Sequence, residues 1–163
     1  MKKTRGFEIV ADIHRKHVVR EEYAKDLSVI NIAPHRADAR SAGYDFVTPT
    51  KLTINPGEQV VVWTDTKAYM QDNEVLQLFV RSSVGIKRNV VLANGTGIID
   101  ASYYNNPDND GNIGICLINI GKTVQHFEAG ERIAQGIFTT YLAADVDLVL
   151  NNERTGGIGS SGK

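Results

Sequence analysis

The segment from Asn94 to Tyr103 (NGTGIIDASY) holds the richest set of chemically useful groups in the sequence. Gly95 and Gly97 predict a tight hairpin bend, whose backbone N–H and C=O groups can bind the edge of a flat ring. Asp100 follows two isoleucines, and a carboxylate that emerges from apolar surroundings can act as a base or approach a metal. Tyr103 offers a flat apolar face with a polar tip. A turn or capping aspartate is the alternative interpretation of Asp100.

A second group, Arg81-Ser82-Ser83 with Gly85, offers a guanidinium, two hydroxyls and nearby backbone amides. These groups suit phosphate oxygens, which accept several hydrogen bonds at once. The alternative is an ordinary polar strand end, which these residues alone slightly favour. Neither serine sits in a nucleophile elbow and no histidine is placed as its base, so a serine nucleophile is not supported.

The tail Thr155–Lys163 is rich in glycine, with four of the fifteen glycines in nine residues. Its run Gly157–Gly162 matches the three glycines of a dinucleotide-binding turn, but that turn requires a following helix, for which one residue leaves no room. What remains is a series of backbone N–H groups able to bind an anion, with Arg154 nearby. On composition alone, a frayed terminus is the favoured interpretation.

The remaining metal-binding and nucleophilic residue types suggest little chemistry. His14 and His17 form an H-x-x-H pair, but two imidazoles without a third ligand are a poor metal site. Cys116 lies in the apolar run Ile113–Ile120, which predicts a small buried hydrophobe. It is the one cysteine, so no intrachain disulfide can form, and a reducing cytoplasm is the simplest location. The sequence also predicts no signal peptide and no membrane span.

The elements that must position these residues are predicted to be strands. The sequence has 16 Val and 15 Ile against nine Leu, and branching at Cβ suits the pleated surface of a sheet. Its apolar segments are short and separated by turn residues, which is typical of a β-sandwich or barrel. Five such segments are Glu58–Thr64, Glu74–Val80, Asn89–Ala93, Ile113–Ile120 and Arg132–Thr140.

Length and charge restrict the possibilities further. The 163 residues suit one domain, and 42% apolar with 23% charged residues is typical of a globular protein. The formal net charge is −1, with 18 Lys and Arg against 19 Asp and Glu. Such a balance argues against a protein that binds nucleic acid non-specifically, so we expect no direct DNA binding.

Five short segments occur in one order across residues 41–162, and together they resemble the five motifs of the homotrimeric dUTP diphosphatases, or dUTPases. Five motifs in register make a chance match very improbable. The insertion 104–110 and the segment KAYMQDNEVL resemble a branch from Gram-positive bacteria and their phages. The motifs are Ser41–Asp45, Val80–Ser83 with Gly85, Asn94–Tyr103, Ala129–Gln135 and Arg154–Gly162.

The resemblance implies an all-β jelly roll that assembles as a homotrimer. Residues 1–150 would form the single β domain, and residues 151–163 a flexible C-terminal arm that closes the active site of neighbouring subunits. The implied activity is hydrolysis of dUTP to dUMP and pyrophosphate with Mg²⁺ as cofactor. This reaction limits uracil incorporation into DNA and supplies dUMP for dTMP synthesis.

The resemblance also implies a role for each motif. Asp100 would activate the water that attacks the α-phosphorus, and Asp45 would help to hold Mg²⁺ through water, because Mg²⁺ dehydrates reluctantly. Tyr103 would stack on the deoxyribose and exclude a 2′-hydroxyl. The uracil edge would be bound by Asn94 and the backbone of Thr96, Gly97, Ile98 and Ile99. The phosphate chain would be held by Arg81, Ser82, Ser83, Gly85 and Gln135, and the γ-phosphate covered by Arg154, Gly157, Gly159, Ser160 and Ser161.

Two positions depart from the family pattern. Ile158 replaces a phenylalanine that stacks on uracil, and an aliphatic side chain can cover the ring but lacks the stacking geometry. The second motif reads Arg-Ser-Ser, as in the dCTP deaminases of the same fold. Those enzymes need a glutamate at the position aligned with Cys116, and a thiol there cannot transfer the protons that loss of an amine requires.

Two alternatives to dUTP hydrolysis remain open. One is a dCTP deaminase-type activity, which Cys116 disfavours. The other is a phage regulatory protein of this fold that uses nucleotide occupancy as a switch and binds a regulatory partner.

Overall fold

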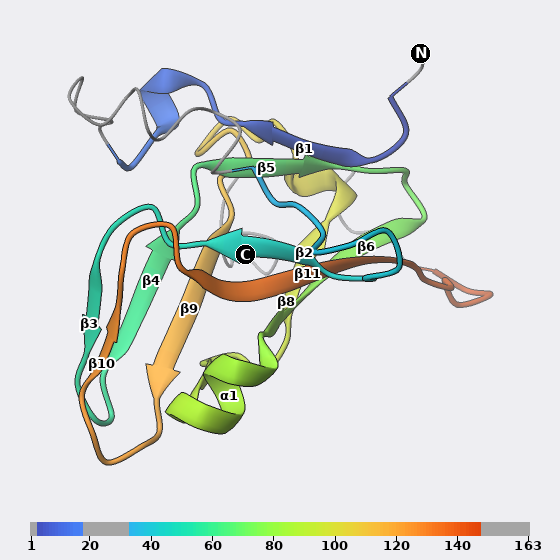
Figure 1. Ribbon diagram of the computed structural model, residues 1–163. Coiled ribbons are helices and arrows are strands. Elements are labelled where there is room, and N and C mark those ends of the chain that lie inside the picture. Colours follow the sequence, from blue (N-terminus) through green and yellow to red (C-terminus); the bar gives the residue numbers. More distant parts are fainter. Residues whose placement is uncertain (1–2, 18–32, 148–163) are drawn as a thin grey trace.

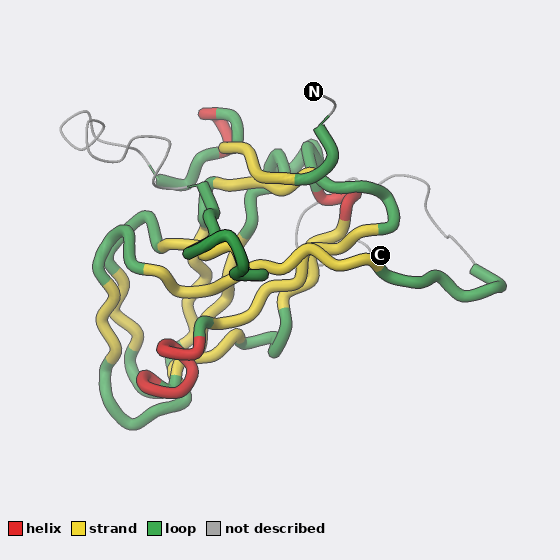
Figure 2. The backbone as a smooth tube through the Cα atoms, turned by 45° about the vertical axis from the view of Figure 1, so that its right-hand side comes forward, coloured by secondary structure: helices red, strands yellow, loops and turns green. Residues whose placement is uncertain are grey.

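The computed structural model describes residues 3–17 and 33–147. Strands dominate these ranges and the helices are short (Figure 2). The strands are β1 (Gly6–Ile9), β2 (Tyr44–Val47), β3 (Leu52–Ile54), β4 (Gln59–Trp63), β5 (Thr66–Tyr69), β6 (Glu74–Val80), β7 (Val90–Leu92), β8 (Gly97–Asp100), β9 (Gly114–Asn119), β10 (Gln125–Phe127) and β11 (Arg132–Thr140). The helices are α1 (Ser82–Arg88) and the 3-10 turns η1 (Asp12–His14) and η3 (Ala101–Tyr103).

The all-β prediction is confirmed, and each of the five predicted strand segments contains a strand. The strands pair antiparallel in four sheets, with orders β1-β5, β10-β3, β2-β11-β6-β8 and β4-β9-β7. Figure 1 shows β3 beside β10 at one end of the molecule and β1 beside β5 across its top. This layered arrangement of short antiparallel strands is consistent with a jelly roll.

The core lies between the four-stranded and three-stranded sheets. Side chains along a strand alternate between its faces, and β9 shows this alternation, with Ile115 and Leu117 almost fully buried. Leu76, Leu78 and Phe46 line the inner face of the four-stranded sheet. Because side chains alternate along each strand, the residues between these positions on β2 and β6, and their partners on β11, lie on the opposite face of that sheet.

Helix α1 was not predicted from the sequence, in which Arg81–Ser83 is also typical of the polar end of a strand. It begins one residue after β6 and ends at Arg88, and the capping residue Asn89 has the left-handed conformation (φ 53°) common at helix ends. Arg88 connects the helix to β10 and to the turn that follows it. Its guanidinium donates to the backbone oxygen of His126, pairs with Glu131, and lies 4.3 Å from the centre of the Phe127 ring.

Within the described residues, no helix is both long and apolar enough to cross a membrane.

Candidate functional site

The first cleft, called here the arginine cleft, has a volume of about 480 Å³. It brings together three of the motifs singled out in the sequence, from β2, from the β6–α1 junction and from β11. The predicted site residues that line it are Asp45, Arg81, Ser82, Ser83 and Gln135. These five residues are separated by up to 90 positions in the sequence, so their meeting is a result of the sheet order β2-β11-β6.

Asp45 is 5% exposed and is the anionic centre of the arginine cleft. Its Oδ1 lies 3.0 Å from Nε of Arg81, and its Oδ2 accepts a hydrogen bond of 3.2 Å from Nη1 of Arg132. Two guanidinium groups therefore compensate one buried carboxylate. Because Arg81 contacts Asp45 through Nε, its two terminal nitrogens can donate to other acceptors.

Arg132 is a residue that the sequence analysis missed. It lies within the quoted segment Ala129–Gln135, but only Gln135 of that segment was given a role. Its residue type could have identified it, because an arginine in a motif that is expected to bind phosphate is itself a candidate phosphate ligand. Its partner Asp45 could not have been identified, because the two positions are 87 residues apart.

Gln135 faces Asp45 across the β11–β2 pair and lies against Gly43. A Cβ atom on Gly43 would stand 2.3 Å from Oε1 of Gln135, well inside the closest approach of real atoms. Position 43 therefore has to be glycine for Gln135 to keep this orientation in the cleft.

Ser82 and Ser83 form the first turn of α1 and are exposed at the edge of the cleft. The interpretation of these serines as a polar strand end is wrong, because the chain turns into the helix directly after β6. Gly85 lies in the same helix, and its N–H donates to the backbone oxygen of Arg81 at 3.0 Å. A phosphate contact by Gly85 stays a prediction.

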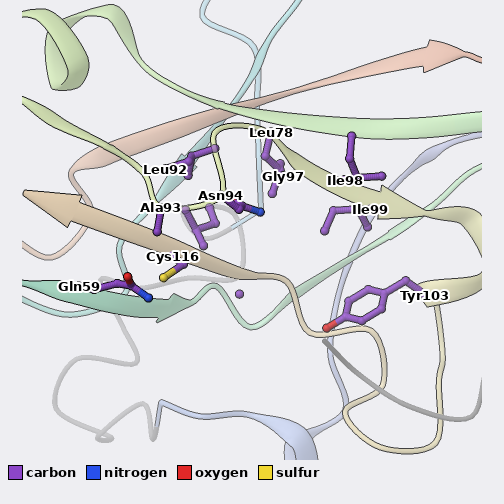
Figure 3. Close-up of a pocket in the computed structure, with 12 residues that line it drawn as sticks. Gln59, Leu78, Leu92, Ala93, Asn94, Gly97, Ile98, Ile99, Tyr103 and Cys116 are labelled. Atoms are coloured by element: carbon purple, nitrogen blue, oxygen red, sulfur yellow. The ribbon is translucent and has the colours of Figure 1, made fainter. Parts of the chain in front are cut away.

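The second cavity, called here the tyrosine pocket, has a volume of about 400 Å³. Figure 3 shows it between β8 on one side and β4 with β9 on the other. Five predicted site residues line it: Asn94, Gly97, Ile98, Ile99 and Tyr103. In the described part of the chain β8 pairs with β6 alone, so its other edge faces this pocket. Unpaired backbone groups on such an edge can bind a planar ligand.

The bend before β8 differs from the predicted hairpin. β7 and β8 do not pair with each other: β7 belongs to the three-stranded sheet and β8 to the four-stranded sheet. The bend is a corner between sheets, with Gly95 at φ +75° and the N–H of Thr96 donating to the oxygen of Asn94 at 2.9 Å. A corner of this kind leaves open the slot that hairpin pairing would have filled.

Gly97 makes room for the inner wall of the pocket. A Cβ at this position would lie 2.9 Å from Cβ of Leu78, so a side chain would push β8 away from β6. Tyr103, at the end of η3, is 4% exposed, and its hydroxyl donates to the backbone oxygen of Asn112 at 2.7 Å. The ring is thus a fixed wall of the tyrosine pocket.

Asp100 ends β8 and is exposed, in contrast to the apolar setting expected for it. Asp100 pairs with Val75 on β6, whereas Asp45 aligns through Gln135 with Phe79. Across the sheet, Asp100 on β8 is therefore three strand spacings from Asp45 on β2. Along the strands, the two residues are offset by four residues. Standard sheet spacings make this separation about 20 Å. One chain therefore does not bring Asp100 to the arginine cleft.

The prediction that Cys116 is buried is wrong. Its side chain is only half-buried and lines the tyrosine pocket near Gln59 (Figure 3). Its backbone oxygen accepts a hydrogen bond of 2.9 Å from the N–H of Ala93, which fixes the start of the bend. A deaminase-type glutamate would need to stand at this position, and a thiol stands there instead.

The predicted residues of the C-terminal motif lie outside the described residues: Arg154, Gly157, Ile158, Gly159, Ser160 and Ser161. Among the residues that are described, no three His, Cys, Asp or Glu side chains gather in a way that could hold a metal ion. Asp45 has both oxygens engaged by arginines, so it fits an outer contact through water and not a direct metal ligand.

Comparison with known proteins identifies this arrangement. The family model for dUTPase matches residues 31–162. The deoxyuridine 5′-triphosphate nucleotidohydrolase of Lactococcus lactis is 41% identical over 161 residues, which are 98% of this chain and 99% of that protein. The crystal structure of dUTPase from Streptococcus mutans is 40% identical with a TM-score of 0.72, and covers 86% of this chain and 99% of its own.

A more distant structure shares the fold. A point mutant of the dUTPase from phage phi11 of S. aureus, which coordinates a structural Mg(II) ion, is 19% identical with a TM-score of 0.65 and covers 92% of this chain and 99% of its own. The motifs quoted in the sequence, the strand order and these matches lead to one assignment. The chain belongs to the dUTPase family.

Proposed function

We propose that this chain hydrolyses dUTP to dUMP and pyrophosphate. The observation that supports the proposal best is the division of its chemistry between two cavities. One is a slot beside an open strand edge, and the other is a cleft in which two arginines flank the single buried carboxylate of Asp45. A nucleoside triphosphate needs both kinds of surface. Family membership and the named activity of the L. lactis relative favour dUTP as the nucleotide.

The tyrosine pocket is the proposed site for uracil and deoxyribose. The open edge of β8, from Gly97 to Ile99, presents backbone groups that match the donors and acceptors of uracil, and the amide of Asn94 adds a side-chain contact. By the family resemblance, the same edge would also exclude the methyl group of thymine. The ring of Tyr103, which lines the pocket, would pack against the sugar where a ribonucleotide would place its 2′-hydroxyl.

Asp100 is the proposed general base. It orients a water molecule and takes its proton as the water oxygen attacks the α-phosphorus. The bond from that phosphorus to the bridging oxygen breaks, and pyrophosphate leaves with the bond's electron pair. A base of this kind typically contributes a factor of about 10² to 10⁴ in rate.

The arginine cleft is the proposed site for the phosphate chain. Arg81, which contacts Asp45 through Nε, can donate two parallel hydrogen bonds from its terminal nitrogens to phosphate oxygens. Ser82, Ser83 and Gln135 add neutral donors around it. Arg132 extends the positive charge of the cleft, so we include it in the proposed site.

Mg²⁺ is the proposed cofactor, because the chain belongs to the dUTPase family and because its proposed substrate carries several negative charges. When bound to the triphosphate, Mg²⁺ would neutralise part of its negative charge and favour one conformation of the phosphate chain. Asp45 contributes through water, because both of its oxygens already accept from guanidinium groups.

The catalytic unit is proposed to be a homotrimer with its sites between subunits. Asp100 lies about 20 Å from Asp45 within one chain, farther than a triphosphate chain can span. A second copy can supply the missing half. The outer face of the four-stranded sheet suits such a contact, because Phe79, Ile98 and Ile137 leave it apolar and partly exposed.

The C-terminal arm, residues 151–163, is proposed to close the assembled site. Arg154, Gly157, Gly159, Ser160 and Ser161 would bind the γ-phosphate, and Ile158 would cover the base. Closure would exclude water and restrain the substrate until product release. The proposed compartment is the cytoplasm.

One experiment separates the proposed reaction from its alternatives. The protein is incubated with Mg²⁺ and either dUTP or dCTP, and pyrophosphate, ammonia and nucleotide products are followed, with Asp100→Asn as control. We expect pyrophosphate from dUTP alone, lost in Asp100→Asn. Ammonia from dCTP would replace the proposal with deamination. Tight binding of dUTP without turnover would indicate a nucleotide-switched regulator.

A further inference from the structure

The loop that follows Tyr103 has no role in the site as proposed so far, although its residues are well packed. It comprises residues 104–112, and three of its asparagines are buried: Asn106 is 4% exposed, Asn109 7% and Asn112 0%. Buried amides must be hydrogen-bonded, so a loop that buries three of them is built around a polar network. The network centres on Tyr103, which lines the tyrosine pocket.

Two hydrogen-bond partners of the Tyr103 hydroxyl belong to this loop. The hydroxyl donates to the backbone oxygen of Asn112 at 2.7 Å and accepts from Nδ2 of Asn109 at 2.8 Å. The backbone oxygen of the same tyrosine accepts from Nδ2 of Asn106 at 2.9 Å. The loop therefore holds Tyr103 at both ends, by its hydroxyl and by its main chain.

The amide of Asn109 has only one orientation that satisfies its neighbours. Its Oδ1 accepts from the N–H of Gly111 at 3.0 Å and from Nδ2 of Asn106 at 2.7 Å. A backbone N–H can only donate, so the oxygen must point to Gly111 and the NH₂ group to the tyrosine hydroxyl. Gly111 has φ +82°, and a Cβ there would lie 2.8 Å from the oxygen of Tyr103.

We propose that Asn109 is a positioning residue for sugar selectivity: it fixes the ring of Tyr103 as a rigid wall that leaves no room for a 2′-hydroxyl. The inference rests on the proposed function, in which Tyr103 packs on the deoxyribose. A pocket wall rejects one extra hydroxyl only if it cannot shift by a few tenths of an ångström, and the network supplies that restraint.

The neighbouring Tyr104 provides a matched control. Its hydroxyl donates to Oε2 of Glu8 at 2.6 Å and thus ties the same loop to β1, but it is not part of the pocket lining. Removing this hydroxyl removes one hydrogen bond of the loop without freeing the Tyr103 ring.

The test measures kcat/KM for dUTP and for UTP in the full chain with Mg²⁺, for Asn109→Ala, Tyr103→Phe, the double variant and Tyr104→Phe. Loss of one buried hydrogen bond corresponds to about a tenfold change. We expect the dUTP:UTP ratio to fall about tenfold in Asn109→Ala, mainly through better use of UTP. Tyr103→Phe should give a similar fall, and the double variant no further one. Tyr104→Phe should keep the wild-type ratio.

A folded Asn109→Ala with an unchanged ratio would overturn the proposal, as would equal loss in Tyr104→Phe. Thermal unfolding of each variant shows which are folded. If Asn109→Ala does not fold, Tyr103→Phe decides, because an unchanged ratio there equally overturns the role of the hydroxyl. If the wild type does not hydrolyse dUTP, the proposed function fails separately. Calorimetric binding of dUMP against UMP then measures sugar selectivity in the same variants.

Discussion

At the scale of single residues, the site depends on where side chains are absent as much as on where they are present. Gly43 and Gly97 each face a neighbour that would collide with a Cβ, Gln135 in one case and Leu78 in the other. Asp45 shows how a side chain that is present contributes. Its buried carboxylate contacts two arginines and so holds both guanidinium groups in place as hydrogen-bond donors.

The close contact at Gly43 leads to a test by double substitution. Gly43→Ala should displace the Gln135 amide and lower kcat/KM for dUTP about tenfold or more, because the added Cβ would lie 2.3 Å from Oε1. Gln135→Ala should have a similar effect and also make room, so Gly43→Ala should add little to it. Steady-state kinetics of the three variants measure this. Fully additive losses would show that Gly43 acts elsewhere.

At the scale of elements, the sheets place the motifs and short attachments keep them in position. The seven-residue helix α1 positions Ser82 and Ser83, and it is too short to be stable alone. The contacts of Arg88 with β10 and with the turn after it therefore stabilise the helix. Strand β6 is attached in the same way at its start, where Arg5 donates to Glu74.

Arg88→Met should loosen α1 while keeping the apolar stem of the side chain. We expect the free energy of unfolding to fall by about 1 kcal/mol, through loss of the bonds to His126 and Glu131. The KM for dUTP should rise more than kcat falls, because the serines would lose their position. Lys87→Met, on an exposed neighbour in the same helix, is the control and should change neither quantity. Urea unfolding and kinetics provide the comparison.

The pair of Glu74 and Arg5 should make stability depend on pH. The hydrogen bond from Arg5 lowers the pKa of Glu74 in the folded protein, with a further decrease from the N–H of Gln71. At acidic pH the unfolded chain then binds the proton more readily than the folded one. The stabilisation is complete above the unfolded pKa, near pH 4 to 5, and is lost as pH falls through the lower folded value.

Urea unfolding between pH 7 and pH 3 measures this contribution. Glu74→Gln and Arg5→Met should each flatten the acid limb of the stability curve, and the double variant should match either one. Added salt should weaken the effect, because Arg5 is 45% exposed. An acid limb that is identical in wild type and Glu74→Gln would show that other groups cause it.

At the scale of the whole molecule, the geometry predicts that activity requires more than one chain. Asp100 and the arginine cleft are about 20 Å apart within the four-stranded sheet. Two variants that are each inactive should therefore complement each other, because a mixed assembly contains some sites with both halves intact.

Complementation can be measured by refolding Asp100→Asn together with Arg81→Ala at equal concentrations. If subunits mix at random, about a quarter of the sites combine an intact Asp100 with an intact arginine cleft, so roughly a quarter of wild-type activity should return. Each variant refolded alone is the control. No recovery in verified mixed assemblies would place both halves in a single chain.

Truncation after Asn152 tests the proposed arm. We expect the trimer to persist, because the sheet face remains, while turnover falls strongly through loss of the γ-phosphate contacts. Light scattering on a sizing column and kinetics measure the two quantities. Full activity in the truncated chain would mean that the glycine-rich tail is only a frayed terminus.

The sequence by itself determined the strand-rich class, because β-branched residues in short segments suit sheets and little else. It also identified the motif residues, since their types and order are local properties of the chain.

The tertiary structure alone decided which of these residues meet. It placed α1 where a strand end was expected, made the Gly95 bend a corner between sheets, and opened the side of Cys116 to a pocket. It also paired Asp45 with Arg132 and Tyr103 with Asn109. The physical reason is that these contacts depend on the order of strands within a sheet and on the path of a loop. Both are set by packing between distant segments, about which local residue patterns contain no information.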